Sequence, residues 1–265
     1  MTKIYAMAMQ KGGVGKTTSV VNMAAFLADR GFRVLVIDLD PQANATSNLG
    51  FNKNKMIPSV YDLLLEKSTL DGVAIHHEES KVSLAPSNPA MAGAEVELVN
   101  IYAREFRLKN ALKQANNTYD YILIDCPPSL GLLTVNALTA AKDGVIVPIQ
   151  CEYLALEGLT QLLDTIKLVR RHLNAELIVR GLIMTMYDKR TNLSRQVVEE
   201  VRKHFPNKVF RTIIPRNIRL SEAPSYGLPI SLYAPNSPGA IAYKILTAEL
   251  VGGDRAKPTN RNSYQ

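Results

Sequence analysis

Between the apolar run Ile4–Met9 and the helix-like segment Lys16–Arg30 stands the octapeptide Lys11-Gly12-Gly13-Val14-Gly15-Lys16-Thr17-Thr18. Glycines at such a place let backbone N–H groups turn toward a phosphate chain, and the following helix adds the positive end of its dipole. We therefore predict that these residues bind a nucleotide. Lys16 is expected to reach the β- and γ-phosphates, and the Thr17 hydroxyl to ligate Mg²⁺.

The loop departs at one point from the usual phosphate-loop pattern, G-x-x-x-x-G-K-[ST]. Gln10 occupies the position of the first glycine, and an additional lysine, Lys11, begins the loop. A chance Gly-Lys-Thr is common in sequences of this size. The whole octapeptide between a strand and a helix is not, so the prediction of a phosphate site stands.

Short apolar runs alternate with longer helix-like segments along the rest of the chain. Several runs are apolar at consecutive positions, which is typical of strands covered on both faces. The predicted strands are Ile4–Met9, Arg33–Asp38, Lys81–Ala85, Tyr121–Asp125, Gly144–Ile149 and Leu177–Thr185, with a weaker one at Val209–Ile214. The predicted helices are Lys16–Arg30, Leu156–Leu173 and Leu193–Phe205. This alternation indicates an α/β protein with a mostly parallel, twisted sheet and helices on both faces. Because the phosphate loop stands between the first strand and the first helix, we expect a P-loop NTPase fold.

The composition suits one globular domain. Apolar residues make up 46% of the 265 residues and charged residues 21%, enough for a sizeable core. No linker divides the chain, so we expect a single domain over residues 1–250, followed by a polar, disordered tail over 251–265. The chain has only two cysteines, no signal-peptide layout and no apolar run of about 18 residues, and we therefore expect a cytoplasmic protein.

Two polar loops that follow predicted strands supply carboxylates. The first is Asp38–Thr46, which contains Asp40, and the second begins with Asp125. Open α/β sheets bind ligands at the carboxyl edge of their strands, and both loops and the phosphate loop lie at that edge. Thr17, Asp40 and Asp125 are therefore the candidate Mg²⁺ ligands.

The net charge of +7 is unevenly distributed along the chain. Residues 166–219 hold 13 Lys and Arg against 4 Asp and Glu, whereas residues 1–165 hold 14 against 17 and residues 220–265 hold 4 against 3. Such an excess in one stretch suggests a polyanionic partner, since neutralisation of phosphates dominates non-specific binding to nucleic acids. The alternative is a solvated basic face without a partner.

The basic stretch carries no known base-reading motif. It lacks a helix-turn-helix or zinc-finger pattern, and an aromatic content of 6% without tryptophan argues against a base-stacking platform. We therefore predict sequence-independent, salt-sensitive contacts with the phosphates of double-stranded DNA. The candidate residues are Arg190, Arg195, Arg202, Lys203, Arg216 and Arg219.

Together these segments resemble one protein family. The loop Lys11–Thr18 is similar to the deviant Walker A form of the ParA/MinD branch of P-loop ATPases, and further segments resemble its ParA/Soj chromosome-partitioning members. Those segments are Asp38–Thr46, Ile124–Gly131, Cys151–Tyr153, Leu156–Leu159, Arg190–Asn192 and Pro215–Ser225. The resemblance covers nearly the whole chain, to about residue 250.

The resemblance implies an ATP-operated switch. ATP with Mg²⁺ would bind a monomer and allow two subunits to close face to face into a homodimer, and hydrolysis would leave ADP. Lys11 would reach the phosphates of the partner subunit and stabilise transition-state charge. Asp40 would orient or deprotonate the attacking water. Lys11, Lys16 and Asp40 are thus the expected catalytic residues.

The same resemblance implies where the base and the partners bind. Met186, Pro215 and Asn217 are candidates to flank the adenine base. In the family, ATP-bound dimers bind DNA without sequence preference, and Arg190 matches a position implicated in that binding. A ParB-like, centromere-binding partner would stimulate hydrolysis and release the dimer from DNA, and the protein would associate with the nucleoid.

Three other functions remain open from the sequence. A MinD-like membrane ATPase would end in a basic amphipathic helix, whereas the last residues here include Pro258 and no apolar face, so we expect no membrane partner. An iron–sulfur carrier would need suitably placed thiolates, and Cys126 and Cys151 form no C-x-x-C pair. A metabolic ligase or kinase would use the phosphate loop on a small substrate.

Overall fold

The computed structural model describes residues 1–115, 118–152 and 157–255. Within these residues seven strands form one sheet in the order β3-β4-β2-β5-β1-β6-β7. Neighbouring strands are parallel, apart from β3, which runs antiparallel to β4. The strands are β1 (Lys3–Met7), β2 (Val34–Asp38), β3 (Ile75–His77), β4 (Val82–Ala85), β5 (Tyr121–Asp125), β6 (Gly144–Gln150) and β7 (Val179–Thr185).

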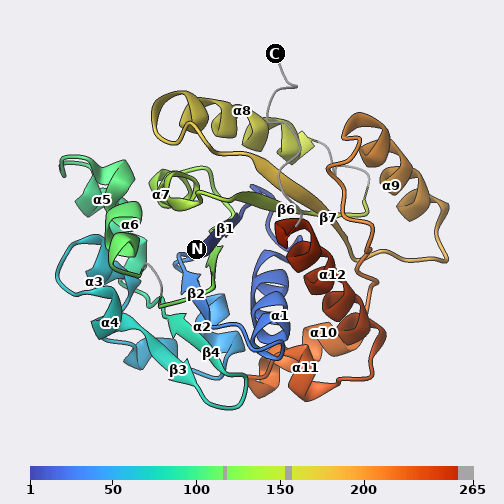
Figure 1. Ribbon diagram of the computed structural model, residues 1–265, viewed down its shortest axis with the longest axis horizontal. Helices are drawn as coiled ribbons and strands as arrows, with labels where there is room; N and C mark the ends of the chain where they lie inside the picture. The colour runs from blue at the N-terminus through green and yellow to red at the C-terminus, as the bar shows by residue number, and fades with distance from the viewer. Residues whose placement is uncertain (116–117, 153–156, 256–265) are drawn as a thin grey trace.

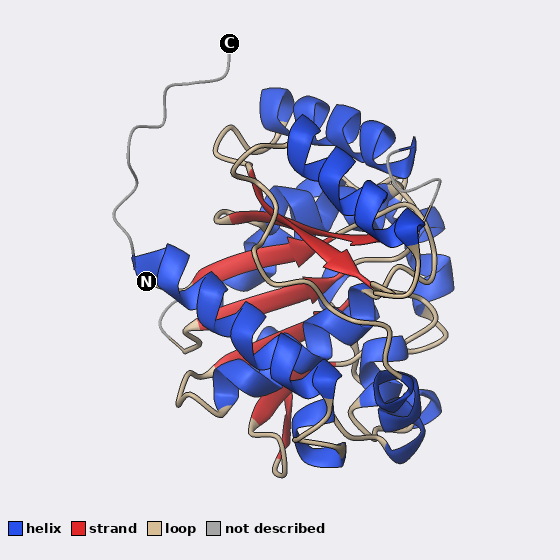
Figure 2. Ribbon diagram, turned by 90° about the vertical axis from the view of Figure 1, so that its right-hand side faces the viewer, coloured by secondary structure: helices blue, strands red, loops and turns tan. Residues whose placement is uncertain are grey.

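Helices cover both faces of the sheet (Figures 1 and 2). One face packs against α1 (Lys16–Ala28), α2 (Asn44–Asn48), α11 (Ile230–Tyr233) and α12 (Pro238–Arg255). The other packs against α3 (Val60–Leu64), α4 (Leu70–Val73), α5 (Met91–Leu98), α6 (Arg107–Ala111), α7 (Leu132–Ala140), α8 (Glu157–His172) and α9 (Asn192–His204). The remaining helices are α10 (Ile218–Glu222) and the 3-10 turns Lys53–Lys55, Arg104–Phe106, Leu112–Ala115 and Ala223–Tyr226.

The central strand β1 shows why the strands are apolar at consecutive positions. Ile4 and Ala6 belong to the core on one face of the sheet, and Tyr5 and Met7 belong to the core on the other. Side chains alternate along a strand, so a strand covered on both faces needs apolar residues throughout. The predicted α/β fold with helices on both faces is confirmed.

The helices α1 and α12 run side by side in the same direction. Tyr243 Oη lies 3.0 Å from Ser19 Oγ, in the first turn of α1. At the far end of α12, the Asp254 carboxylate accepts hydrogen bonds from Tyr5 Oη at 2.6 Å and Tyr121 Oη at 3.0 Å. Tyr121 is the first residue of β5, at the amino edge of the sheet. The start of α12 therefore lies at the carboxyl edge of the sheet, where the phosphate loop is.

Two expectations differ from the structure. The segment Val209–Ile214 is not a strand and meets β7 at the isolated pair Leu182–Val209, because the backbone N–H groups of Arg211 and Thr212 donate to the Glu249 carboxylate of α12.

The second difference concerns residues 251–255, which continue α12 instead of beginning a tail. Asp254 holds this end of the helix, since it also pairs with Arg180 of β7, with Arg180 Nη2 3.1 Å from its Oδ1. The remaining predicted tail, 256–265, and the motif residues Tyr153 and Leu156 lie outside the described residues.

Candidate functional site

The phosphate loop joins the end of β1 to α1 at the centre of the sheet. Gly13 and Gly15 adopt φ angles of 73° and 89°, in the left-handed region that glycine enters without strain. Among the described residues no side chain caps the first turn of α1, so its N–H groups are available to an anion. The Val14 carbonyl accepts a hydrogen bond from Thr185 Oγ1 at 2.9 Å, which ties the loop to the end of β7.

The two lysines of the loop differ in environment. Lys16 is buried, and its Nζ donates to the Lys11 carbonyl at 3.3 Å. Burial lowers the pKa of Lys16, while the charges of Asp125 and Asp40 oppose this shift. A buried ammonium gains most from an anion beside it, which agrees with the predicted phosphate contact. Lys11 is half-buried, with its Nζ 3.5 Å from Glu152 Oε2.

The remaining loop residues surround these lysines. Gly12 and Gly13 are exposed, Val14 is buried, and Thr17 and Thr18 are half-buried. Among the described residues, apart from the chain neighbours of Gly13, nothing lies within 4 Å of where a Cβ of Gly13 would stand. The exposed glycines leave the backbone open to a ligand.

Asp38 fixes the loop that carries Asp40. It ends β2 and pairs in register with Asp125, which ends β5. The Asp38 carboxylate accepts hydrogen bonds from the Asp40 N–H at 3.1 Å, the Thr46 N–H at 2.8 Å and the Thr46 hydroxyl at 2.7 Å. Burial raises the pKa of Asp38 to about 6, although these hydrogen bonds act to lower it. The sequence named this residue only as the start of a polar loop.

The Asp125 carboxylate is buried, and neither of its oxygens has a hydrogen-bond partner among the described residues. Burial raises its pKa well above the usual value, and the charge of Asp38 raises it further. The nearby Thr17 hydroxyl and the positive charge of Lys16 act to lower it. A buried carboxylate without a partner is costly, and a cation would satisfy it. Asp125 and Thr17 therefore fit the predicted Mg²⁺.

The form of that ion site follows from its surroundings. The described residues hold no group of three or more His, Cys, Asp and Glu side chains that could cage a metal. Mg²⁺ commonly takes one or two carboxylates and completes its shell with phosphates and water. The site thus suits an ion that enters with a nucleotide.

Asp40 lies with these residues at the carboxyl edge. It is 5% exposed, and its Oδ1 accepts a hydrogen bond from the Gln42 N–H at 2.9 Å. Its charge acts on both Lys16 and Asp125. The structure thus brings together the lysine and the two carboxylates named from the sequence, an arrangement able to hold a triphosphate, its cation and a water molecule.

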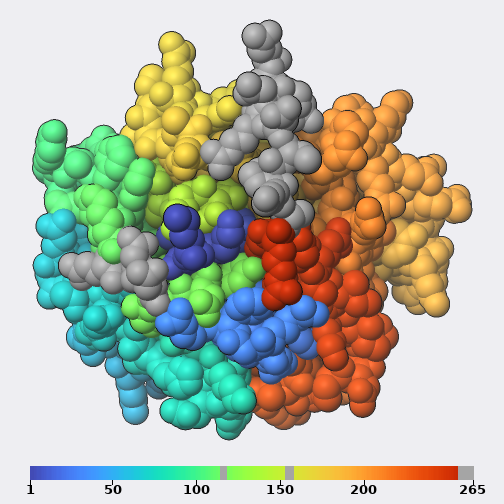
Figure 3. Space-filling view, viewed as in Figure 1, coloured from blue at the N-terminus to red at the C-terminus, as the bar shows by residue number. Residues whose placement is uncertain are grey.

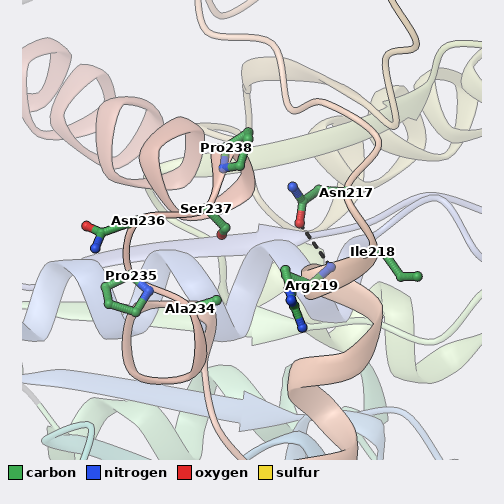
Figure 4. Close-up of a pocket in the computed structure, with 8 residues that line it drawn as sticks. All are labelled: Asn217, Ile218, Arg219, Ala234, Pro235, Asn236, Ser237 and Pro238. Carbon is green, nitrogen blue, oxygen red and sulfur yellow. Dashed lines mark hydrogen bonds between the residues drawn. The ribbon is translucent and has the colours of Figure 1, made fainter.

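The predicted base-binding residues occupy two places. Met186 follows β7 with a φ of 53°, and its neighbour Tyr187 pairs with Pro215. Asn217 caps α10 and lines a cavity of about 530 Å³ (Figure 4). The other lining residues are Ile218, Arg219, Ala234, Pro235, Asn236, Ser237 and Pro238. The cavity adjoins the start of α12 and so lies at the phosphate-loop edge; Met186 and Pro215 do not line it.

The predicted DNA-binding residues are all exposed. Arg195, Arg202 and Lys203 lie on α9, which forms a lobe at the right-hand side of Figure 3. Arg216 precedes α10, Arg219 lies in the first turn of α10, and Arg190 precedes α9. Two of them have acidic partners: Arg219 Nη1 lies 2.8 Å from Glu222 Oε2, and Arg190 Nη2 lies 2.7 Å from Asp188 Oδ2.

Two further observations bear on the open alternatives. Cys126 and Cys151 are buried, and burial raises the pKa of both thiols, which disfavours the thiolate form that ligates iron–sulfur clusters. Among the helices of the described residues, none combines the length and the apolar character that crossing a membrane requires.

Comparison with known sequences gives close matches over nearly the full length. A family model described as an AAA domain matches residues 2–179. Sporulation initiation inhibitor protein Soj of Bacillus subtilis is 54% identical over 250 residues, which cover 94% of this chain and 98% of Soj. Chromosome partitioning protein ParA of Myxococcus xanthus is 49% identical over 259 residues, which cover 98% of this chain and 91% of ParA.

Solved structures share the fold over almost the whole chain. Cobyrinic acid a,c-diamide synthase of Mycobacterium smegmatis, with bound ATP analog and magnesium, superposes with a TM-score of 0.85 at 39% identity, covering 98% of this chain and 100% of that one. A plasmid partition protein of Borrelia burgdorferi bound to AMPPNP gives a TM-score of 0.79 at 27% identity, covering 96% and 100%.

Proposed function

The chain belongs to the Soj/ParA family of chromosome-partitioning ATPases, and from this we propose that it is a Mg²⁺- and ATP-dependent switch that binds DNA without sequence specificity. One observation carries the proposal. β7 ends at Thr185, whose hydroxyl bonds to the phosphate loop, and five residues later the same segment reaches the exposed Arg190. A single short segment therefore connects the nucleotide edge to the basic surface, by which we mean the predicted DNA-binding residues Arg190, Arg195, Arg202, Lys203, Arg216 and Arg219.

The buried charged residues at the carboxyl edge indicate how the nucleotide would bind. The loop N–H groups and Lys16 would hold the phosphates of ATP, with Thr17 and Asp125 on the magnesium ion. The bound ion would neutralise phosphate charge that the protein alone offsets only in part. Asp40 would orient the attacking water from the same edge of the sheet. The relatives with bound ATP analog and magnesium or AMPPNP support this arrangement.

Lys11 is suited to act across a dimer interface. Its ion pair with Glu152 is long at 3.5 Å, and the two side chains are 36% and 54% exposed. Such an exposed pair contributes roughly 0–1 kcal/mol, so the lysine can exchange it for a phosphate of a second copy. ATP would therefore hold two protomers together, each completing the other's site.

Dimerisation would convert nucleotide state into DNA affinity. Two basic surfaces in one particle meet twice as many phosphates, and the second contact becomes effectively intramolecular. Hydrolysis, stimulated by a ParB-like partner as the family membership suggests, would separate the protomers and release DNA. The protein would then be found on the nucleoid in the cytoplasm while ATP is bound.

A mobility-shift experiment tests this proposal. The protein is incubated with two unrelated duplexes of equal length in ATP and Mg²⁺, in ADP and Mg²⁺, and without nucleotide. Both duplexes should be retarded equally, in ATP only, and Lys16→Ala should abolish the retardation. Equal retardation in all three conditions, or retardation of one duplex alone, would contradict it.

One relative suggests a second candidate function. The M. smegmatis structure carries the name of a synthase that forms amides on a small molecule, at 39% identity, whereas the partition proteins reach 54% and 49%. The two functions separate in a turnover assay. A partition switch should hydrolyse ATP faster when DNA and a ParB-like partner are present, whereas a ligase should depend on a small carboxylic acid substrate and ignore DNA.

A further inference from the structure

One acidic side chain lies within the basic surface. The Asp188 side chain is 16% exposed and stands between β7 and α9, beside the Arg190 side chain, which is 80% exposed. Arg190 donates to it from Nε at 2.9 Å, from Nη2 at 2.7 Å and from its backbone N–H at 3.0 Å. The two side-chain bonds form a bidentate pair that fixes the plane of the guanidinium.

A second arginine lies near the same carboxylate. Hydrogen bonds from Arg190 are the main reason why the pKa of Asp188 lies far below its usual value, and the charge of Arg216 lowers it further. The backbone brings Arg216 there: Tyr187 N–H donates to the Ile214 carbonyl at 3.0 Å, and Arg216 N–H donates to the Tyr187 carbonyl at 2.9 Å. Asp188 is therefore paired with Arg190 and lies near a second arginine from a separate segment.

Two opposite consequences for DNA binding are conceivable. By charge alone, a carboxylate on this surface repels phosphates and neutralises Arg190. By geometry, it holds the long, exposed Arg190 side chain in one orientation. This side chain then has less rotamer freedom left to lose when it binds a phosphate. The bidentate pair uses two N–H donors of the side chain, and the remaining donors are left for a phosphate.

We propose that Asp188 is a positioning residue of the DNA-binding surface, which presents Arg190 to the phosphates of duplex DNA. The inference rests on the proposed function, because it concerns the same DNA contact. It adds that an acidic residue increases affinity for a polyanion.

The sign of one substitution separates the two consequences. Asp188→Asn removes a negative charge from the surface, yet it should weaken DNA binding about tenfold and reduce the salt slope by about one, as if one phosphate contact were lost. The matched control is Glu199→Gln, which removes one charge from the exposed side of α9. This control should bind DNA as tightly as the unmodified protein or more tightly.

A double-mutant cycle completes the test. In an Arg190→Ala background, Asp188→Asn should cause little further loss, because the positioned side chain is gone. ATP affinity and thermal unfolding of each variant show that it is folded. If Asp188→Asn does not fold, Arg190→Lys decides, since it keeps the charge and loses the bidentate pair: about tenfold weaker binding is expected, and unchanged affinity would overturn the proposal.

Each outcome has a separate meaning. If Asp188→Asn binds DNA as tightly as the unmodified protein or more tightly, the positioning role is overturned. Asp188 would then only neutralise the charge of Arg190. If the unmodified protein shows no ATP-dependent DNA binding, the proposed function itself fails, and this control is measured in the same experiment.

Discussion

The carboxyl edge of the sheet and the basic surface beyond β7 place charged side chains in opposite environments. At the edge, Lys16, Asp38 and Asp125 are at most 6% exposed, whereas the Arg190 side chain on the surface is 80% exposed. Buried charges interact strongly and are little screened, while exposed charges act weakly, additively and under the control of salt. Single substitutions should therefore act in an all-or-none way at the edge and by graded amounts on the surface.

The largest effect is expected for Lys16→Ala. It removes the buried ammonium that faces the predicted phosphates, so ATP binding should become undetectable by calorimetry at micromolar protein. Lys142→Ala, which removes an exposed lysine, is the control and should bind ATP normally. Measurable ATP affinity in the Lys16→Ala variant would contradict the all-or-none effect that we expect for substitutions of buried charges at the carboxyl edge.

Asp40→Ala should separate binding from hydrolysis. Loss of a residue that orients or deprotonates water lowers the rate by about 100-fold or more, whereas the phosphate loop and Asp125 remain in place. Phosphate release should fall accordingly, ATP affinity should stay within about threefold, and the variant should remain on DNA. Rapid turnover would refute the role assigned to Asp40.

Two Arg–Asp pairs that differ in burial allow a direct comparison of their contributions to stability. The Asp254 side chain, paired with Arg180, is 6% exposed and also binds Tyr5 and Tyr121, whereas Asp188 pairs with an Arg190 in solvent. Asp254→Asn should lower the free energy of unfolding by about 2 kcal/mol, because it leaves a buried arginine without its counter-charge. Asp188→Asn should lower it by less than about 1 kcal/mol. Urea denaturation measures both, and equal losses would contradict the comparison.

The same contrast explains how much of the fold could be predicted from the sequence. The phosphate loop and α1 depend on local chemistry, since glycines at fixed places and a helix start are visible in one short pattern. The end of α12 depends on Asp254, which bonds to Tyr5 at a separation of 249 residues along the chain. The failed strand Val209–Ile214 depends on Glu249, which takes two of its N–H groups. Neither contact leaves a local signal.

The candidate site divides along similar lines. Lys16 follows from the phosphate-loop pattern, Asp40 and Asp125 follow from their places after strands, and the structure brings the three together. Asp38 was missed as the organiser of its loop, because its role depends on the register of β2 with β5. Asp188 was missed because the sequence shows it only as one of four acidic residues in the basic stretch 166–219. The Mg²⁺, base and DNA contacts stay predictions until a ligand is bound.

The smallest of the expected single-site effects lies on the surface. Arg190→Ala should weaken DNA binding about tenfold at moderate salt, while ATP-dependent dimerisation, followed by light scattering, is unchanged. Arg195→Ala should have a smaller effect, because this side chain bonds to the neutral Asn192 and, within the part of the chain that the structure describes, pairs with no carboxylate. Unchanged DNA affinity in the Arg190 variant would discard that contact.

The most direct test of the link between the two regions is the dependence of DNA affinity on salt, measured by fluorescence anisotropy with the ATP analog AMPPNP and with ADP. If closing two protomers over nucleotide joins their basic surfaces, the slope of log affinity against log salt should be about twice as steep with the triphosphate analog, since twice as many phosphates are neutralised. Equal slopes and equal affinities in the two states would contradict the account, because the basic surface would then be indifferent to the nucleotide.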